Sequence, residues 1–261
     1  MMKRVAQVLR ALISRKWWWV TILVLLGMAL FLRLSKWQFD RLQQRRAANA
    51  VLAETLAAPP FALTAVSLPP NPETLQNREV TVHGTYDLDN QLGLKIQNWN
   101  GRAGIHLIAP LVFPDRETAV LVDRGWIPDS EAAVAQWTQF DETEPLTVTG
   151  YVALSQTISR LSAEEAIPDE PQKEWYRVDV AAIQAQMPYD LLPVYVVQSP
   201  PPEGDTEPPF HAAREVDLSE GPHLSYAIQW ILFALVLGGG YVVFVDKSVS
   251  KIHAEEVDET S

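Results

Sequence analysis

Two long apolar runs lie near opposite ends of this chain, and they constrain its fold more than any other feature. Residues 224–245 hold 22 positions without a charge. At about 1.5 Å per residue, a helix of that length reaches about 33 Å, enough to cross a bilayer core of about 30 Å. Residues 17–32 are fewer, but basic side chains at both ends can extend the span by reaching the interface. The Trp17-Trp18-Trp19 triplet is typical of an aromatic belt. The sequence therefore predicts two transmembrane helices.

The first run has an alternative interpretation as a cleaved signal peptide, because a basic segment precedes it. Ala48-Asn49-Ala50 even offers a small-residue cleavage pattern. That pattern lies far beyond the apolar run, across a stretch with five basic residues, which favours an uncleaved anchor. No transit-peptide pattern fits ahead of residue 17, so we expect a bacterial plasma (inner) membrane rather than a mitochondrial one.

The charge is divided unevenly along the chain. The net charge is +9 over residues 1–46, −17 over residues 47–222 and −3 over residues 223–261. An acidic central region speaks against nucleic acid, which needs a basic face. There is no cysteine, which excludes disulfides, thiolate metal sites and a cysteine nucleophile. The expected partners are therefore membrane lipids and other proteins.

The chain divides into six expected parts. We expect a basic N-terminus at 1–16, a transmembrane helix at 17–34, a juxtamembrane helix at 35–58, a β-rich domain at 59–222, a second transmembrane helix at 223–245 and an acidic tail at 246–261. The juxtamembrane part should stay helical because it contains neither Pro nor Gly before Pro59-Pro60. Basic residues are balanced around the first span, so charge counts alone leave the orientation open.

The central region has the pattern of an antiparallel β domain. Apolar and polar residues alternate in 80–86, 92–98 and 147–154, and apolar runs occupy 105–113, 119–122 and 194–198. Turn residues at Asp89-Asn90, Asn100-Gly101 and Pro114-Asp115 fit hairpins. Residues 129–140 and 179–187 look helical, each opening with an Asp suited to an N-cap, and the prolines of 199–209 predict an extended loop. We therefore expect a barrel-like or sandwich-like α+β domain between two transmembrane helices.

No motif in the chain indicates an enzyme. The pattern lacks a G-x-S-x-G elbow, a P-loop and a dinucleotide-binding glycine motif. The five histidines show no metal-binding spacing. A membrane-anchored hydrolase would need a serine or acid with a base beside it, and we find no such set. We expect no catalytic residues.

The most informative chemistry lies where the two spans meet the same membrane face. A two-span chain brings the exit of the first helix and the start of the second to one side of the bilayer. The candidate cofactor-binding residues there are Trp37, Gln38, Arg41, His223, Tyr226 and Trp230. An imidazole, aromatic walls and a guanidinium suit a flat apolar macrocycle with acidic arms, with His223 as ligand of the iron. The alternative is an aromatic belt and a helix–helix contact, with His223 merely hydrogen-bonded in the interface.

Four segments together resemble the Surfeit locus protein one (Shy-type) family of cytochrome c oxidase assembly factors. The segments are Trp37-Gln38 with Arg41, Arg78 to Asp87, Val120 to Pro128, and His223 to Trp230. Two positions depart from the family pattern. Ser35 stands where the family usually has Gly, which bears on helix packing. Gly221 stands where it usually has Asn, which bears on how the second helix begins.

The resemblance implies two transmembrane helices, an extracytoplasmic β domain, and a cytoplasmic N-terminus and C-terminal tail. It also implies a membrane factor that binds or helps deliver haem a to the catalytic subunit of the oxidase. It implies His223 as axial ligand, Trp37 and Gln38 as interface partners, and Arg41 as a contact for a haem propionate. The implied protein partners are the catalytic subunit and haem A synthase. The alternative is a membrane scaffold that stabilises an oxidase intermediate without touching haem.

The resemblance also covers a segment of the β domain whose residues have a structural interpretation. We expect Gly125 to permit a tight turn after a strand that ends near Asp123, and Trp126 to fill a core. Arg124 should pair with an acid. For Asp123, an ion pair with Arg124 and a position beside that acid both stay open.

Overall fold

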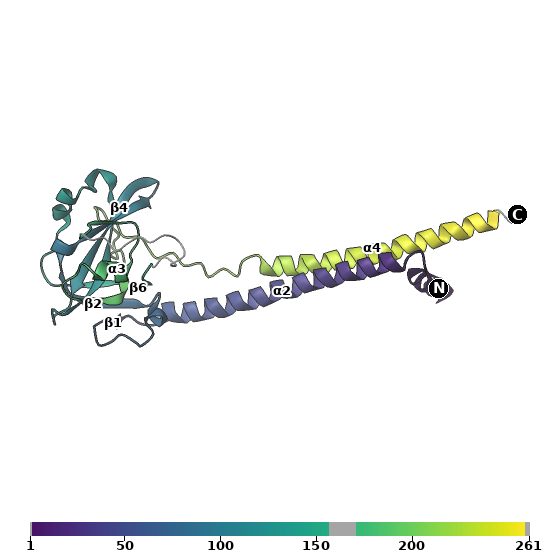
Figure 1. The fold of residues 1–261 in the computed structure, drawn as a ribbon, viewed down its shortest axis with the longest axis horizontal. Helices are drawn as coiled ribbons and strands as arrows, with labels where there is room; N and C mark the ends of the chain where they lie inside the picture. Colours follow the sequence, from purple (N-terminus) through teal and green to yellow (C-terminus); the bar gives the residue numbers. More distant parts are fainter. Residues whose placement is uncertain (1, 157–170, 259–261) are drawn as a thin grey trace. The chain divides into compact units, whose positions relative to one another are not determined.

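The computed structural model describes residues 2–156 and 171–258, which form two compact units (Figure 1). One unit comprises Met1–Val51 and Leu218–Ser261, and the other comprises Leu52–Asp217. The first unit contains helix α1 (Met2–Leu12), most of α2 (Trp18–Ala57) and α4 (His223–Asp258). The second unit contains the β-sheet.

Helices α2 and α4 are each long and apolar enough, by length and composition, to cross a membrane. Helix α2 is uninterrupted over 40 residues and ends just before Pro59-Pro60, so the predicted continuation of the helix beyond the apolar run is confirmed. Helix α4 continues to Asp258, which means that the predicted tail begins as part of the same helix.

The second unit contains an eight-stranded sheet that closes on itself. The strands are β1 (Phe61–Ala62), β2 (Glu79–Tyr86), β3 (Leu92–Trp99), β4 (Arg102–Val112), β5 (Thr118–Pro128), β6 (Leu146–Leu154), β7 (Glu174–Trp175) and β8 (Asp190–Gln198). Their order is β1-β2-β6-β8-β5-β4-β3-β7, and an extra pairing of β2 with β4 closes five of them into a barrel. The pairings β1–β2, β3–β7 and β5–β8 are parallel and the others antiparallel. The prediction of a mainly antiparallel, barrel-like domain is confirmed.

Local sequence signals account for several junctions of the barrel. Asn100 and Gly101 connect β3 to β4 with φ angles of 51° and 80°, the left-handed pair that a tight hairpin requires. Asp179 caps the short helix α3 (Val180–Gln184) by accepting a hydrogen bond from the backbone N–H of Ala182 at 3.2 Å. Both features were predicted from the residue types.

The helix expected at residues 129–140 is wrong. Two short 3₁₀ helices, η3 (Asp129–Glu131) and η4 (Val134–Phe140), replace it. Ala133 between them has an extended backbone, with φ −65° and ψ 131°, and this breaks the helical run. Asp129 is not an N-cap, because Pro128 holds the cap position and no side chain caps the turn. Two further short 3₁₀ helices, η1 (Pro72–Leu75) and η2 (Leu88–Asn90), lie before and after β2.

The strand expected to end near Asp123 continues to Pro128, so the predicted tight turn at Gly125 is also wrong. The register against β4 shifts between His106 and Ile108, which makes this part of β5 a bulge. Gly125 has φ +109°, and a Cβ there would lie 2.8 Å from the backbone oxygen of Phe210. The glycine is required by the bulge and by the close passage of the segment that contains Phe210.

The bulge turns Arg124 into the domain, where the predicted ion pair is found. Its side chain is 1% exposed and bonds Gln91, the backbone oxygen of Phe140 and the carboxylate of Glu142. The guanidinium carbon lies 4.6 Å from the ring centre of Tyr86. Trp126 is fully buried, as expected. The apolar interior of the barrel comes mainly from β2, β4, β5, β6 and β8, and a second apolar layer lies between the sheet and α3.

Candidate ligand site at the start of helix α4

Helices α2 and α4 pack antiparallel along a regular seam (Met28, Phe31, Ser35 and Gln38 on α2; His223, Ala227, Trp230 and Gly238 on α4). Met28 fills the space over Gly238, and the rings of Phe31 and Trp230 stack with centres 5.6 Å apart. Ser35 is buried and donates a hydrogen bond of 3.0 Å to the backbone oxygen of Ala227. Spacings of three and four residues recur on both helices, which is the pattern of knobs-into-holes packing.

His223 is the first residue of α4 and is half-buried. Its Nδ1 lies 2.9 Å from Oε1 of Gln38, which places the amide of α2 against the imidazole of α4. Nε2 has no hydrogen-bond partner within the part of the chain that the structure describes. Gly221 lies beside the ring with φ +68°, and a Cβ there would lie 3.8 Å from Nε2. One ring nitrogen is therefore held and the other is unpaired.

The approach segment (residues 218–222) is attached to α2 just before His223. The Arg46 guanidinium forms a two-point contact with the Glu220 carboxylate at 2.7 and 2.9 Å. This pair holds the pKa of Glu220 below its usual range, first through the hydrogen bond and then through the charge of Arg46. The Asn49 amide donates to the backbone oxygen of Leu218 at 2.6 Å. Neither contact was predicted, because the partners are more than 160 residues apart in sequence.

The other candidate residues differ in position. Trp230 lies in the seam, as described. Trp37 and Tyr226 are 48% and 46% exposed. Arg41 is exposed on α2, with its guanidinium carbon 5.7 Å from the ring centre of Trp37 and a hydrogen bond to Gln44. The structure thus brings Gln38 and His223 together and leaves Trp37, Arg41 and Tyr226 on the outer surfaces of the helices.

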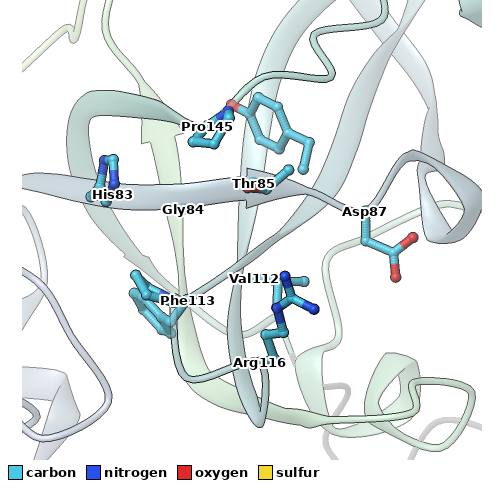
Figure 2. A pocket seen from close by; sticks show the side chains of 10 residues that line it. His83, Gly84, Thr85, Asp87, Val112, Phe113, Arg116 and Pro145 are labelled. Carbon is cyan, nitrogen blue, oxygen red and sulfur yellow. The ribbon is translucent and has the colours of Figure 1, made fainter.

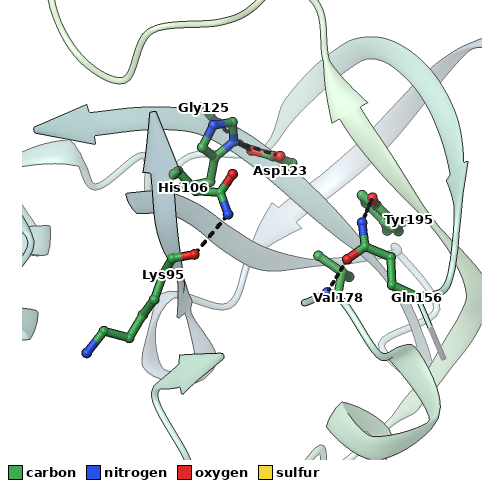
Figure 3. A network of polar contacts seen from close by, with 8 residues as sticks. Lys95, His106, Asp123, Gly125, Gln156, Val178 and Tyr195 are labelled. Atoms are coloured by element: carbon green, nitrogen blue, oxygen red, sulfur yellow. Dashed lines mark hydrogen bonds and ion pairs between the residues drawn. The ribbon is translucent and has the colours of Figure 1, made fainter. Parts of the chain in front are cut away.

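In the barrel unit, acids hold the imidazoles of His211, bound by Asp205, and of His106 (Figure 3). Nδ1 of His106 lies 2.9 Å from both carboxylate oxygens of Asp123, which also accepts the N–H of Gly125. Tyr195 accepts a hydrogen bond from Gln156 nearby. Burial, and next the charge of Asp123, raise the pKa of Tyr195 to about 12. No serine or threonine is hydrogen-bonded to His106 in the described chain, so the pair has the form of a structural clamp at the bulge.

The barrel also has an open pocket of about 630 Å³ where β2 leaves β6 and joins β4. Figure 2 shows Arg116 rising from the β4–β5 turn beside Val112, with His83 across the pocket. Asp87 in its lining already accepts from Tyr189 and Asn90, and His83 contacts Thr147. Its polar side chains therefore have other partners or lie apart, and the pocket offers no convergent set of reacting groups.

His223 therefore offers a ligand-type nitrogen with a fixed partner at the start of an apolar helix. No group of three or more His, Cys, Asp or Glu side chains capable of holding a metal ion is present within the described residues. A metal bound to His223 would therefore need most of its ligand atoms from another molecule, such as the macrocycle of a haem.

Comparison with known proteins gives a consistent result. The SURF1 family model matches residues 25–235, most of the chain. A SURF1-like protein of Monosiga brevicollis is 27% identical over 217 residues, covering 76% of each chain. An uncharacterized SURF1-like protein of Mycobacterium tuberculosis is 24% identical over 243 residues, covering 90% of this chain and 87% of the relative. The matched region includes most of α2, the first part of α4 and every strand of the sheet.

Proposed function

Because this chain belongs to the SURF1 family, whose members are linked to cytochrome c oxidase assembly and are not known enzymes, we propose that it binds haem a and helps deliver it to the catalytic subunit of the oxidase. The observation that carries the proposal is the state of His223. One ring nitrogen is held by Gln38 and the other has no partner among the described residues, at the end of an apolar helix.

The residues around His223 fit a haem. When bound, haem supplies an iron with a coordination position that an imidazole nitrogen can fill. His223 would supply Nε2, and the lack of a side chain at Gly221 leaves that nitrogen approachable. Phe31 and Trp230 provide an aromatic surface one to two turns into the seam. Arg41 is exposed and has no acidic partner within the described chain, which suits a haem carboxylate.

The positions of two polar contacts along the seam support a particular placement of the helix pair in the membrane. A second polar contact, between the hydroxyls of Thr21 and Tyr241 at 2.7 Å, lies at the other end of the helix pair. Thr21 and Gln38 are separated by about 26 Å of helix, close to the thickness of the hydrocarbon core of about 30 Å. We propose that the two contacts mark the two interfaces of a bacterial inner membrane. Because the spans are antiparallel, both termini lie on one side of that membrane and the barrel lies on the other. From membership of the SURF1 family, we propose that the side of the barrel is extracytoplasmic.

The proposed protein partners are the oxidase catalytic subunit and haem A synthase, which would receive and supply the haem. A scaffold function without haem is the second candidate, and a different observation favours it. Among the described residues, no other part of the chain lies within 4 Å of the Cβ positions that side chains would have at Gly239 and Gly240 of α4. Small residues of this kind allow a partner helix to approach closely in a membrane. On the scaffold hypothesis, His223 is replaceable and this glycine surface is not.

The deciding experiment is an absorption spectrum of the full chain purified in detergent from cells that make haem A. We expect a near-stoichiometric haem a band that is lost in His223→Ala and retained in His83→Ala, a matched change at an exposed histidine of the barrel. If the wild-type protein is colourless while the membranes it came from contain haem A, the haem proposal fails. In that case Gly239→Leu should impair oxidase assembly, as the scaffold hypothesis requires.

A further inference from the structure

The contact between Gln38 and His223 joins two helices and also bears on which ring nitrogen of His223 carries the proton. We infer that Gln38 is the positioning residue of His223: its carbonyl oxygen keeps the ring proton on Nδ1, so that Nε2 presents a bare lone pair away from α2. The role of that lone pair as a haem ligand rests on the proposed function. The tautomer itself does not, and it can be measured without haem.

The tautomer follows from the atoms that face each other. A neutral imidazole has one N–H donor and one acceptor nitrogen, and the partner of one nitrogen sets the state of the other. Oε1 of Gln38 can only accept, and it lies 2.9 Å from Nδ1. Nδ1 must therefore carry the proton, and Nε2 must be the acceptor. An amide turned the other way would donate to Nδ1 and place the proton on Nε2, where it would block a metal.

Gln38 is itself held in place by its neighbours on α2. One turn before it, Ser35 is 4% exposed and bonds the backbone oxygen of Ala227, which is fully buried. One turn after it, Leu42 is 3% exposed. The amide thus belongs to a stretch of helix whose rotation is fixed on both sides, because buried contacts tolerate little displacement.

The backbone of His223 is fixed by a different set of contacts on the same helix. Arg46 and Asn49 hold the approach segment two to three turns beyond Gln38. Gly221 then makes the left-handed turn that leads into α4. The Arg46–Glu220 pair is exposed and is therefore weak and sensitive to salt. Gln38 is the contact that acts on the ring itself.

The chemical consequence is that of an outer partner of a metal ligand. A hydrogen bond from the second ring nitrogen to an oxygen fixes the orientation of the ring and raises the basicity of the ligating nitrogen. Removal of such a partner typically costs about 10- to 100-fold in metal affinity. Gln38 therefore acts through His223 and not by touching the ligand.

The test uses the full chain in detergent with ¹⁵N-labelled histidine, first without haem. The His223 signals are those that disappear in His223→Ala. Three variants are compared: Gln38→Leu, which removes the acceptor; Gln38→Glu, which can present only oxygens to the ring; and Gln43→Leu, the same change at an exposed position of α2. Far-UV circular dichroism checks that each variant keeps its helices. Ferric protoporphyrin titration then gives the affinity of each protein.

We expect the wild type, Gln43→Leu and Gln38→Glu to show a proton on Nδ1, and Gln38→Leu to show a mixture of tautomers. Porphyrin affinity should fall about 10- to 100-fold in Gln38→Leu only. The inference is overturned if the wild-type ring carries its proton on Nε2, or if Gln38→Leu leaves both tautomer and affinity unchanged. If the tautomers behave as expected but no variant, including the wild type, binds porphyrin or haem a, the proposed function fails while the role of Gln38 in fixing the ring stands.

Discussion

Arg124 in the barrel and His223 on α4 are both polar groups removed from water, but they differ in how fully they are paired. Arg124 is 1% exposed and has three hydrogen-bonding partners and an aromatic ring against it. His223 is half-buried and has one partner. A polar group with its bonding capacity mostly met contributes to the uniqueness of a fold. A group with an unpaired, reachable nitrogen has capacity left for a ligand.

The comparison is tested most strongly by removing the buried guanidinium. Arg124→Met should destabilise the barrel by about 3–5 kcal/mol, because the buried oxygens of Gln91 and of the Phe140 backbone lose their donor, at about 1–3 kcal/mol each. Urea unfolding with hydrogen exchange at the β4 and β5 amides would measure the loss. Arg102→Met is the control, since Arg102 is exposed although its guanidinium also lies over an aromatic ring. Equal effects of the two changes would contradict the structural role of Arg124.

The next largest loss of stability is expected from a substitution at Gly125, in the bulge that directs Arg124 inward. Gly125→Ala should cost about 2–3 kcal/mol, because its Cβ would combine a left-handed backbone with a clash at the oxygen of Phe210. Gly101→Ala should cost about 1 kcal/mol, since its φ is also positive but its Cβ would meet open space. The same unfolding measurement applies to both. A larger loss at Gly101 than at Gly125 would show that the contact with Phe210 is not tight.

The raised pKa of Tyr195, a mostly buried tyrosine of the barrel, should make the stability of the barrel depend on pH. Its folded pKa of about 12 lies above the usual value of 10, so the folded state retains the proton more tightly. This stabilisation is complete below pH 10 and is lost as pH rises towards 12, with about 1 kcal/mol gone by pH 11. Urea unfolding between pH 8 and 11 should show a smaller decline in Tyr195→Phe. Burial also raises the pKa values of Tyr86 and Tyr189, so part of the decline should remain.

The smallest expected effect on stability is at His223. His223→Ala removes a single hydrogen bond in a half-buried position, so it should cost about 1 kcal/mol or less. Thermal unfolding followed by circular dichroism at the helical minimum would detect it. If this change destabilised the protein as much as Arg124→Met, the imidazole would be a structural group, and the contrast between the two sites would disappear.

Much of the architecture could be predicted from local patterns. The length of the apolar runs predicted α2 and α4, and alternation predicted most strands of the barrel. The departure at residue 221 is also understandable in retrospect, because Gly and Asn are the residues that best tolerate the left-handed backbone found there. Ser35, the other departure, fills the close helix contact with a hydrogen bond to the opposite helix where a glycine would leave only space.

The features that could not be predicted all depend on residues distant in sequence. Alternation does not reveal that β2 closes the barrel on β4 or that β5 pairs in parallel with β8. Gly125 suggested a turn because a left-handed glycine is common in turns, and only the register against β4 shows the bulge. The pairing of Gln38 with His223 depends on the relative rotation of two helices, for which a single sequence has no signal.

The uninterrupted course of α2 makes the Gln38 contact an indicator of helical phase. Each residue turns a helix by about 100°, so deleting one residue between Ser35 and Gln38 would leave the lipid-embedded contacts of α2 unchanged and rotate its amide to another face. Inserting seven residues there would restore the direction but raise the amide by about 10 Å. Gln38 can therefore reach the imidazole of His223 at only one rotation of α2 and one position along its axis. A flexible break in α2 just before Gln38 would let the amide rotate independently of the part of the helix in the membrane, and the contact with His223 would be lost.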